Sequence, residues 1–262
     1  MNNNSYMQAE EQLTREKLAK IADLIKGKRE RQQALNAEAA RIHRQVLQGK
    51  NWSDELLASF NDLADNQEQL GKETSELAND KLTGAKVFMH LLGKSAEAMQ
   101  EASKRMRERL ERAKERLNRN ADKESNPDAA AENLANDDIQ KLQQTALRRI
   151  DQVLEALKQD KGLRAGNQNS GSRGGGGGGG GGQHGGGEGD NIPPMSQLKA
   201  LKALEQEIYD RTRDFHKKHP EASKLNSKEQ EELRALRREQ QELTDLFRDI
   251  TAPPAEPEGG KK

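Results

Sequence analysis

The amino-acid sequence predicts an all-α protein: long amphipathic helices in antiparallel hairpins or coiled coils, with a disordered Gly-rich linker and disordered termini. Three observations lead to this prediction. Hydrophobic residues make up 31% of the 262 residues and charged residues 34%, which suits narrow contacts between helices better than a thick, layered core. Apolar residues recur at alternating steps of three and four along most of the chain. Nine consecutive glycines, residues 174–182, interrupt this pattern, and glycine costs roughly 1 kcal/mol per helical position relative to alanine.

Shifts in composition divide the chain into five segments. Residues 1–7 are polar, and we expect them to be disordered. Residues 8–161 are expected to form a helical hairpin or bundle domain, and residues 162–191 a flexible Gly-rich linker. Residues 192–251 are expected to form a C-terminal helical hairpin. Residues 252–262 contain three prolines and are expected to be a disordered tail.

The first predicted helix covers about residues 8–48, and Gly49 follows it as a stop signal. Its apolar stripe has heptad spacing and would make a helix roughly 60 Å long. Lys28 and Gln32 interrupt the stripe, and polar side chains at such positions usually fix register and partner number. The apolar members of the stripe are Leu18, Ile21, Ile25, Leu35, Ala39, Ile42 and Val46.

Ser53 is the expected N-cap of a second helix, whose stripe includes Leu63, Gln67 and Leu70. The few residues between the first two helices predict an antiparallel hairpin. Gly84 then predicts a kink or break, after which a further amphipathic pattern resumes at Ala85.

Pro127 ends any continuous helix, so another helix must start after it. The sequence offers two starts: near Ala129, or at Asp137, which would form a capping box with Gln140.

Beyond the linker, two prolines at residues 193–194 predict a helix entrance, and His219 followed by Pro220 predicts its end. Ser227 and Gln230 predict a capping box for the last helix. Its heptad stripe includes Leu233, Leu236, Gln240, Leu243, Phe247 and Ile250.

The pattern Leu-x-x-x-Gln-x-x-Leu occurs twice, first at Leu63, Gln67 and Leu70 and again at residues 236–243. Each occurrence follows a serine cap signal and another amphipathic helix, so we interpret the chain as two related helical hairpins on either side of the linker. A buried Gln67 or Gln240 would need an amide partner across the stripe, and a pair of such glutamines could supply it.

Charge gives no general support to nucleic-acid binding, because basic and acidic side chains number 44 each. Between Lys104 and Arg119, however, there are eight basic and three acidic residues. We interpret this stretch as a cation-rich helix end, which the helix dipole favours. Weak nucleic-acid binding through the same stretch stays open as an alternative.

No residue pattern indicates an enzyme. The carboxylates are spread over solvated helix faces, and the sequence contains no nucleophile elbow, phosphate loop or dinucleotide fingerprint. There is no cysteine, His43 lies on a polar face, and His216 and His219 are better explained as surface residues at a helix end than as metal ligands. We therefore expect no catalytic, cofactor-binding or metal-binding residues.

No apolar run approaches the roughly 20 residues that a membrane-spanning helix needs, and the first residues lack an apolar signal region. We expect a cytoplasmic location by default, or an envelope location if the sequence is a piece of a longer protein. Binding to a membrane surface through an amphipathic helix stays open, and residues 87–106 come nearest to the required pattern.

Several segments are rich in Leu, Gln and Ala: both Leu-x-x-x-Gln-x-x-Leu patterns, residues 95–102 (SAEAMQEA) and residues 146–150 (ALRRI). Through them the chain resembles the Leu/Gln/Ala-rich, coiled-coil-like regions of large uncharacterised bacterial proteins, which are often secreted or membrane-attached. The resemblance implies a helical, envelope-associated, non-enzymatic protein.

The leading expectation is a non-enzymatic structural or interaction protein, a coiled-coil scaffold that engages partner helices or further copies of itself. The alternatives are a peripheral cell-envelope or membrane-surface protein and a weak nucleic-acid binder. The residues expected to form the interaction stripe are Leu18, Ile21, Leu35, Leu63, Gln67, Leu70, Leu236, Gln240, Leu243 and Phe247.

Overall fold

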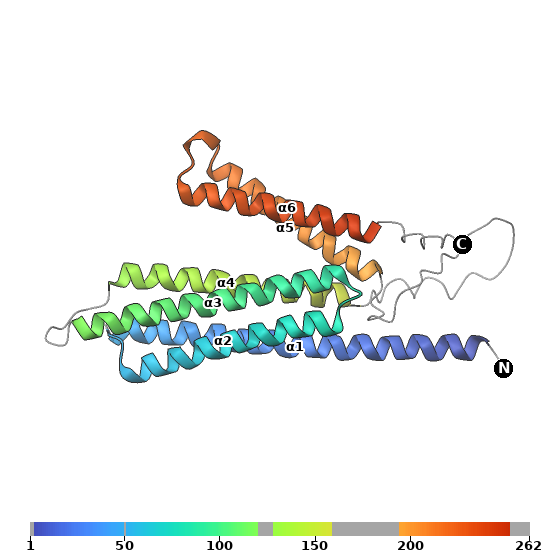
Figure 1. Cartoon of the computed structure of the whole chain (residues 1–262), viewed down its shortest axis with the longest axis horizontal. Coiled ribbons are helices and arrows are strands. Elements are labelled where there is room, and N and C mark those ends of the chain that lie inside the picture. Colours follow the sequence, from blue (N-terminus) through green and yellow to red (C-terminus); the bar gives the residue numbers. More distant parts are fainter. Residues whose placement is uncertain (1–2, 50, 120–127, 159–193, 252–262) are drawn as a thin grey trace, which may run out of the picture. The chain divides into compact units, whose positions relative to one another are not determined.

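The structure is a computed structural model that describes residues 3–49, 51–119, 128–158 and 194–251 (Figure 1). Within these ranges the fold is all-α, with six α-helices, one short 3-10 helix and no strand. The chain divides into two compact units, Met1–Ile192 and Pro193–Lys262. The Gly-rich linker predicted at residues 162–191 and the tail predicted at residues 252–262 lie outside the described residues.

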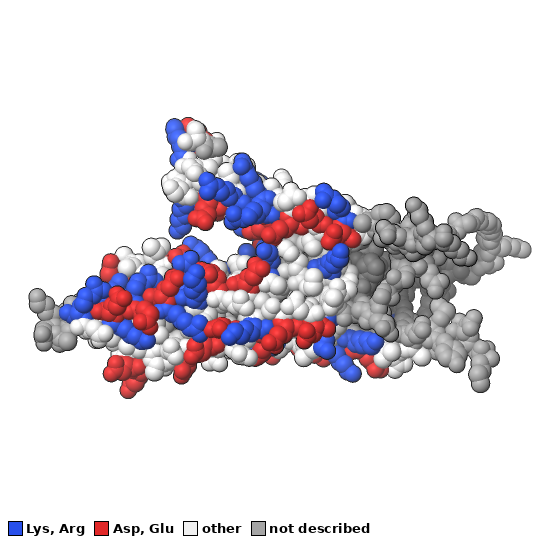
Figure 2. Space-filling model, in the orientation of Figure 1, with Lys and Arg blue, Asp and Glu red and all other residues white. Residues whose placement is uncertain are grey.

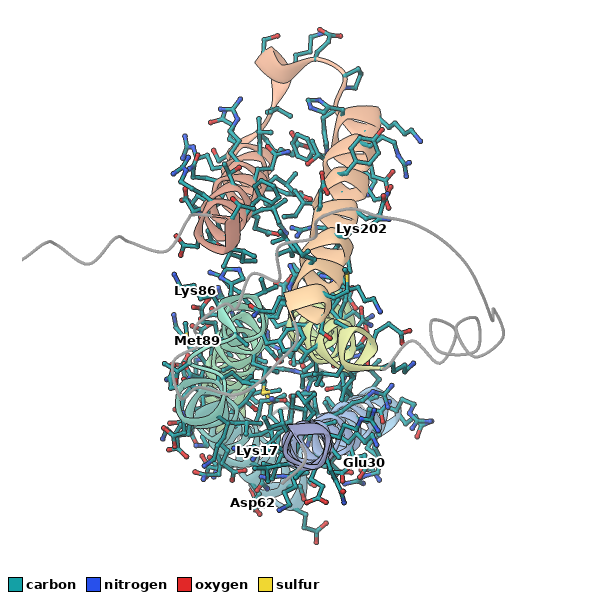
Figure 3. The ribbon with its side chains drawn as sticks, turned by 90° about the vertical axis from the view of Figure 1, so that its right-hand side faces the viewer. Lys17, Glu30, Asp62, Lys86, Met89 and Lys202 are labelled. Atoms are coloured by element: carbon teal, nitrogen blue, oxygen red, sulfur yellow. The ribbon has the colours of Figure 1, made fainter. Side chains whose placement is uncertain are left out.

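The first unit is an up-and-down bundle of four helices (Figure 1). Helix α1 packs against α2 and α4, and α3 packs against the same two helices, so the four close into a ring. In the end-on view of Figure 3, side chains fill the space between the helices, whereas Glu30 and Asp62 lie on the outer surface. The helices are α1 (Asn3–Gly49), α2 (Asp54–Lys81), α3 (Lys86–Arg119) and α4 (Ala129–Leu157).

Helix α1 is longer than the sequence predicted. It begins at Asn3, so residues 3–7, which were expected to be disordered, are helical. These residues include neither glycine nor proline, and extending a helix that is already formed costs far less than starting one. The 47 residues of α1 span roughly 70 Å, about two thirds more than the 28 residues of α2.

Local capping chemistry sets where α2 and α4 begin. Ser53 caps α2 by accepting a hydrogen bond from the Leu56 amide at 3.2 Å, as the sequence predicted. Asp128 caps α4, where its Oδ1 accepts from the amides of Ala130 and Ala131 at 3.0 and 3.3 Å. The alternative start at Asp137 is wrong, because nothing after Asp128 interrupts the helix there.

The core of the first unit is built from the inward-facing stripes of all four helices, together with Trp52. Gly71 allows α2 and α3 to approach closely, because a Cβ at this position would lie 3.0 Å from the Gln100 Cγ and 3.3 Å from the Ala96 carbonyl oxygen. One group of buried core residues comprises Ala39, Ile42, Val46, Trp52, Phe60, Leu63, Ala64, Met106, Leu110, Ala113 and Ile139.

The second unit is a helical hairpin of α5 (Pro194–Lys218) and α6 (Ser227–Thr251), with the 3-10 helix η1 (Ala222–Lys224) in its loop. Asn226 caps α6: its Oδ1 accepts from the Glu229 amide at 3.0 Å, and the Glu229 carboxylate accepts from the Asn226 amide at 2.8 Å. The predicted box of Ser227 and Gln230 is therefore wrong by one residue, because asparagine caps as well as serine and Glu229 completes the reciprocal pair.

None of the described helices is long and apolar enough to cross a membrane.

Candidate functional site

A layer of three buried glutamines joins α1, α2 and α4 in the first unit. The amides of Gln32 and Gln67 bond reciprocally, at 2.9 and 2.7 Å, and Gln143 donates to the same Gln67 oxygen at 3.1 Å. Gln32 also donates to Asn36 at 2.7 Å. A buried polar group without a partner costs about 1–3 kcal/mol, so this layer favours a single register of the helices. The amide partner predicted for a buried Gln67 is thus Gln32.

Arg109 on α3 is the largest of the fully buried side chains, with 1% of its surface exposed. Its Nε donates to the Glu132 carboxylate of α4 at 2.9 Å, and the second Glu132 oxygen accepts from Arg116 at 3.1 Å. The guanidinium carbon also lies 5.2 Å from the ring centroids of both Trp52 and Phe60, within the range of cation–π attraction. A buried charge is thus surrounded by one carboxylate and two aromatic faces.

His43 on α1 completes this cluster. A guanidinium can only donate, so the His43 Nδ1, 2.9 Å from the Arg109 Nη2, must accept, and the His43 Nε2 carries the proton that faces the Asn133 oxygen at 3.0 Å. Burial lowers the pKa of His43, and the positive charge of Arg109 lowers it further. The sequence placed His43 on a polar face, which is wrong, because Arg109 of α3 covers it.

The Arg109 cluster suits the fixing of helix register better than ligand binding. Burial lowers the pKa of Arg109, and the Glu132 carboxylate opposes that effect. The side chains of Arg109, Glu132 and His43 are all closed off from solvent, and they bind one another across α1, α3 and α4. Within the described ranges, the buried donors Trp52 Nε1 and Arg109 Nη1 of this cluster make no hydrogen bond.

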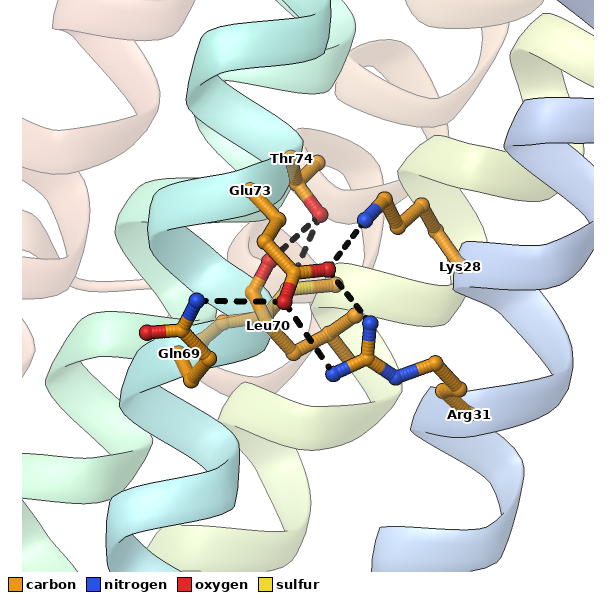
Figure 4. Close-up of polar contacts among 7 residues, drawn as sticks. Lys28, Arg31, Gln69, Leu70, Glu73 and Thr74 are labelled. Atoms are coloured by element: carbon orange, nitrogen blue, oxygen red, sulfur yellow. Dashed lines mark hydrogen bonds and ion pairs between the residues drawn. The ribbon is translucent and has the colours of Figure 1, made fainter.

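At the edge of the same unit, Glu73 of α2 holds two cations of α1 (Figure 4). Lys28 and Arg31 both form ion pairs with its Oε2, and Gln69 donates to Oε1 at 3.1 Å. These donors lower the pKa of Glu73 to about 2. Lys28, which interrupts the apolar stripe of α1, therefore has its counter-ion within the chain.

The basic stretch between Lys104 and Arg119 is largely neutralised in the folded chain. Among the residues that the structure describes, seven of its eight basic side chains form ion pairs and Arg112 forms none. Figure 2 shows positive and negative side chains intermingled over the visible face of this unit. Little positive charge is left to attract phosphates, which gives less support to the nucleic-acid alternative. The pairs are Lys104–Glu101, Arg105–Glu101, Arg107–Asp65, Arg109–Glu132, Lys114–Glu111, Arg116–Glu132 and Arg119–Glu115.

The second unit presents an open groove between α5 and α6. At its loop end the hairpin is closed by a small core of Phe215, Leu225 and Leu236. Towards the other end the two helices leave a recess of about 520 Å³. The recess is lined by Leu198, Leu201, Lys202, Glu205, Leu243, Thr244 and Phe247.

Large apolar side chains at this groove remain in contact with solvent. Phe247 is 53% exposed and Leu198 is 38% exposed. Met195, one turn before Leu198 on α5, and Tyr209, further along the same helix face, are each 60% exposed. Phe247 and Leu198 line the recess, whereas Met195 and Tyr209 lie on α5 outside its lining. Exposed apolar side chains at a recess are a common feature of protein-binding surfaces.

The residues predicted to contact partner helices divide into two groups. Those of the first unit face other helices of their own chain: Ile21, Leu63, Gln67 and Leu70 are buried, and Leu18 and Leu35 are partly buried. In the second unit Leu236 is buried within the hairpin, Leu243 is partly buried, and Gln240 and Phe247 are exposed.

Sequence reasoning did not identify the Arg109 cluster or the two charged side chains that line the groove, Lys202 and Glu205. Arg109 had a detectable signal, because it lies three residues after Met106 and so falls on the apolar face of α3. Glu132 and Lys202 had none, because their positions on the helix surface resemble those of many solvated charges.

Among the described residues, no group of three or more His, Asp or Glu side chains is arranged to hold a metal ion. Comparisons with protein families, with curated proteins and with solved structures gave no match to this chain. The function proposed below therefore depends on the geometry of this chain alone.

Proposed function

We propose that this protein is a non-enzymatic interaction protein, in which the four-helix unit serves as a scaffold and the C-terminal hairpin binds an amphipathic helix. The observation that supports this proposal is the open groove between α5 and α6, where Phe247 is 53% exposed beside a recess of about 520 Å³. The binding mode would be coiled-coil-like, with the added helix lying along both members of the hairpin.

The four-helix unit supports the scaffold role because its stripes are already covered. Each of its helices packs against two others, and hydrogen bonds of the glutamine layer and of the Arg109 cluster join the helices inside it. Leu63 and Leu70, which lie on the expected interaction stripe, are buried by the chain itself. Opening this unit to admit a partner would expose those polar layers, which makes it a poor binding surface.

The hairpin supports the binding role because its two helices leave apolar side chains such as Leu198 and Phe247 exposed. A third amphipathic helix in the groove would bury Phe247, Leu198 and Leu243 together. Burying the exposed half of a phenylalanine side chain contributes on the order of 1 kcal/mol, and several such side chains give useful affinity. The hairpin thus has the incomplete core that helix-in-groove recognition requires.

A single fluorescent label tests this proposal, because the chain contains no cysteine. Thr244→Cys places the label acrylodan in the groove, and Arg238→Cys places it on the opposite face of α6. Titration with a synthetic Leu/Glu/Lys heptad peptide should shift the emission of the groove label to the blue and leave the control label unchanged. No shift at residue 244, or equal shifts at both positions, would reject the groove as a helix-binding surface.

A further inference from the structure

We propose that the occupant of the groove is the same hairpin of a second copy of this chain, packed across a two-fold axis with the α5 helices antiparallel. This inference rests on the proposed function, since it names the helix that the groove binds. A two-fold interface brings one patch against itself, so the patch must carry both a protrusion and a recess, and both opposite charges.

The groove meets the requirement of shape. Phe247 lies at the groove with half of its surface exposed, next to a recess of about 520 Å³ formed partly by the same side chain. The exposed apolar surface continues along α5 through Leu198 and Met195. Two copies related by a two-fold axis would therefore each insert a Phe247 ring against α5 of the other.

The groove also meets the requirement of charge. Lys202 and Glu205 both line it and lie three residues apart on α5. In the part of the chain that the structure describes, neither forms an ion pair, whereas nearby Arg211 pairs with Glu239 at 2.5 Å and Arg213 with Asp210 at 3.1 Å. A groove lined by apolar side chains and by two unpaired opposite charges is suited to a partner that places an acidic side chain opposite Lys202 and a basic side chain opposite Glu205.

An antiparallel second copy supplies that order. When the two-fold axis passes midway between residues 202 and 205, Lys202 of each copy faces Glu205 of the other, which gives two equivalent ion pairs. The same register places Leu198 level with Tyr209 of the second copy, and both side chains are partly or largely exposed in the single chain. One register therefore satisfies the charges and covers two exposed apolar side chains.

Net charge does not oppose the pairing. Residues 192–262 contain 14 basic and 14 acidic side chains, and the whole chain is also neutral. Two copies consequently approach without long-range repulsion, and the pattern of charges along α5 decides the orientation.

Charge reversal in the full-length chain tests the inference by size exclusion with light scattering. The wild-type chain should show a mass approaching twice 29.2 kDa as its concentration rises. Lys202→Glu or Glu205→Lys alone places like charges together and should weaken the dimer by roughly tenfold or more. An equimolar mixture of the two variants should restore a dimer, because the first then presents only acids and the second only bases. The double variant, which reverses both charges, should also dimerise.

Lys228→Glu is the matched control for Lys202→Glu, because it makes the same change of net charge on the exposed hairpin surface outside the groove. Its dimer should be as strong as the wild type's, and circular dichroism should show equal helicity in all variants. A wild-type chain that stays monomeric at every concentration would overturn the inference, as would single variants no weaker than Lys228→Glu or a mixture that fails to pair. If the label at residue 244 responds to the heptad peptide in a chain that never dimerises, the second copy is rejected while helix binding in the groove stands. If neither is seen, both proposals fail.

Discussion

Removing the Glu132 carboxylate should destabilise the first unit far more than removing a surface carboxylate. Glu132→Ala leaves the Arg109 guanidinium buried and without its counter-ion, whereas half-exposed Arg116 can turn towards solvent. Breaking a buried ion pair by deleting one partner typically costs about 3–5 kcal/mol. The matched control is Glu101→Ala on α3, which loses exposed pairs to Lys104 and Arg105 and should cost only about 0–1 kcal/mol.

Urea denaturation measures both losses. Trp52 is the chain's one tryptophan, and it lies 5.2 Å from the Arg109 guanidinium carbon, so its fluorescence reports the unfolding of this unit separately from the hairpin. Replacing both partners, with Arg109→Met and Glu132→Leu, should recover most of the lost free energy of unfolding, because no buried charge then remains. A Glu132→Ala loss no larger than the Glu101→Ala loss would show that the pair is not buried in solution and would refute the reasoning.

Three further predictions, which use four substitutions, concern the same unit. Burial and Arg109 lower the pKa of His43 in the folded state, so the unfolded chain binds a proton more readily and stability falls as the pH drops below about 6.5. His43→Asn should therefore flatten this part of a profile of urea midpoint against pH. An unchanged slope would contradict the lowered pKa of His43. Gly93→Ala should raise the free energy of unfolding by up to about 1 kcal/mol, because nothing lies near the added methyl group. Gly71→Ala should give no such gain, since the added Cβ meets α3. Equal gains in the thermal midpoint would contradict the close approach of α2 and α3 at Gly71. Gln67→Leu leaves the amides of Gln32 and Gln143 without their shared acceptor and should cost about 2 kcal/mol in urea denaturation; a neutral effect would show that water replaces it.

The helical class of the fold was accessible from the sequence because it depends on local information. The three-and-four spacing of apolar residues, the serine at residue 53 and the glycine at residue 84 each act through their neighbours in the chain. Local information predicts the ends of helices less accurately, because more than one capping signal can occur within a few residues. At the start of α6 two overlapping capping signals compete, and Asn226 with Glu229 forms the box that was assigned to Ser227 and Gln230.

The sequence does not show which helices cover an apolar stripe, because the same residue pattern occurs in a covered helix and in a partly exposed one. Gln67 and Gln240 occupy equivalent places in one repeated pattern, yet Gln67 is buried and Gln240 is exposed. The difference arises from α3, which packs against α2, and from α4, whose Gln143 donates to Gln67. Among the described residues the second unit has only α5 and α6 and the short 3-10 helix between them. Periodicity identifies the apolar face of a helix, whereas the number of helices available to cover it depends on contacts distant in the sequence.

This contrast connects structure to the proposed role. A chain that covers most of the apolar stripes of one unit and leaves the groove of another open separates stability from binding. The first unit can therefore tolerate changes at the groove, and the hairpin can gain stability when its apolar face is covered. Phe247 belongs to the binding surface of the hairpin, because it lines the groove and is not part of the closed core at the loop.

The most direct test of this division compares the acrylodan label at residue 244 in two backgrounds, with Phe247 intact and with Phe247→Lys. With Phe247 intact, the heptad peptide should shift the emission to the blue in a saturable titration. With Phe247→Lys, the shift should be lost while the urea midpoint reported by Trp52 stays unchanged. A shift that survives the substitution, or one that is absent in both backgrounds, would contradict the account of the hairpin groove as the binding surface.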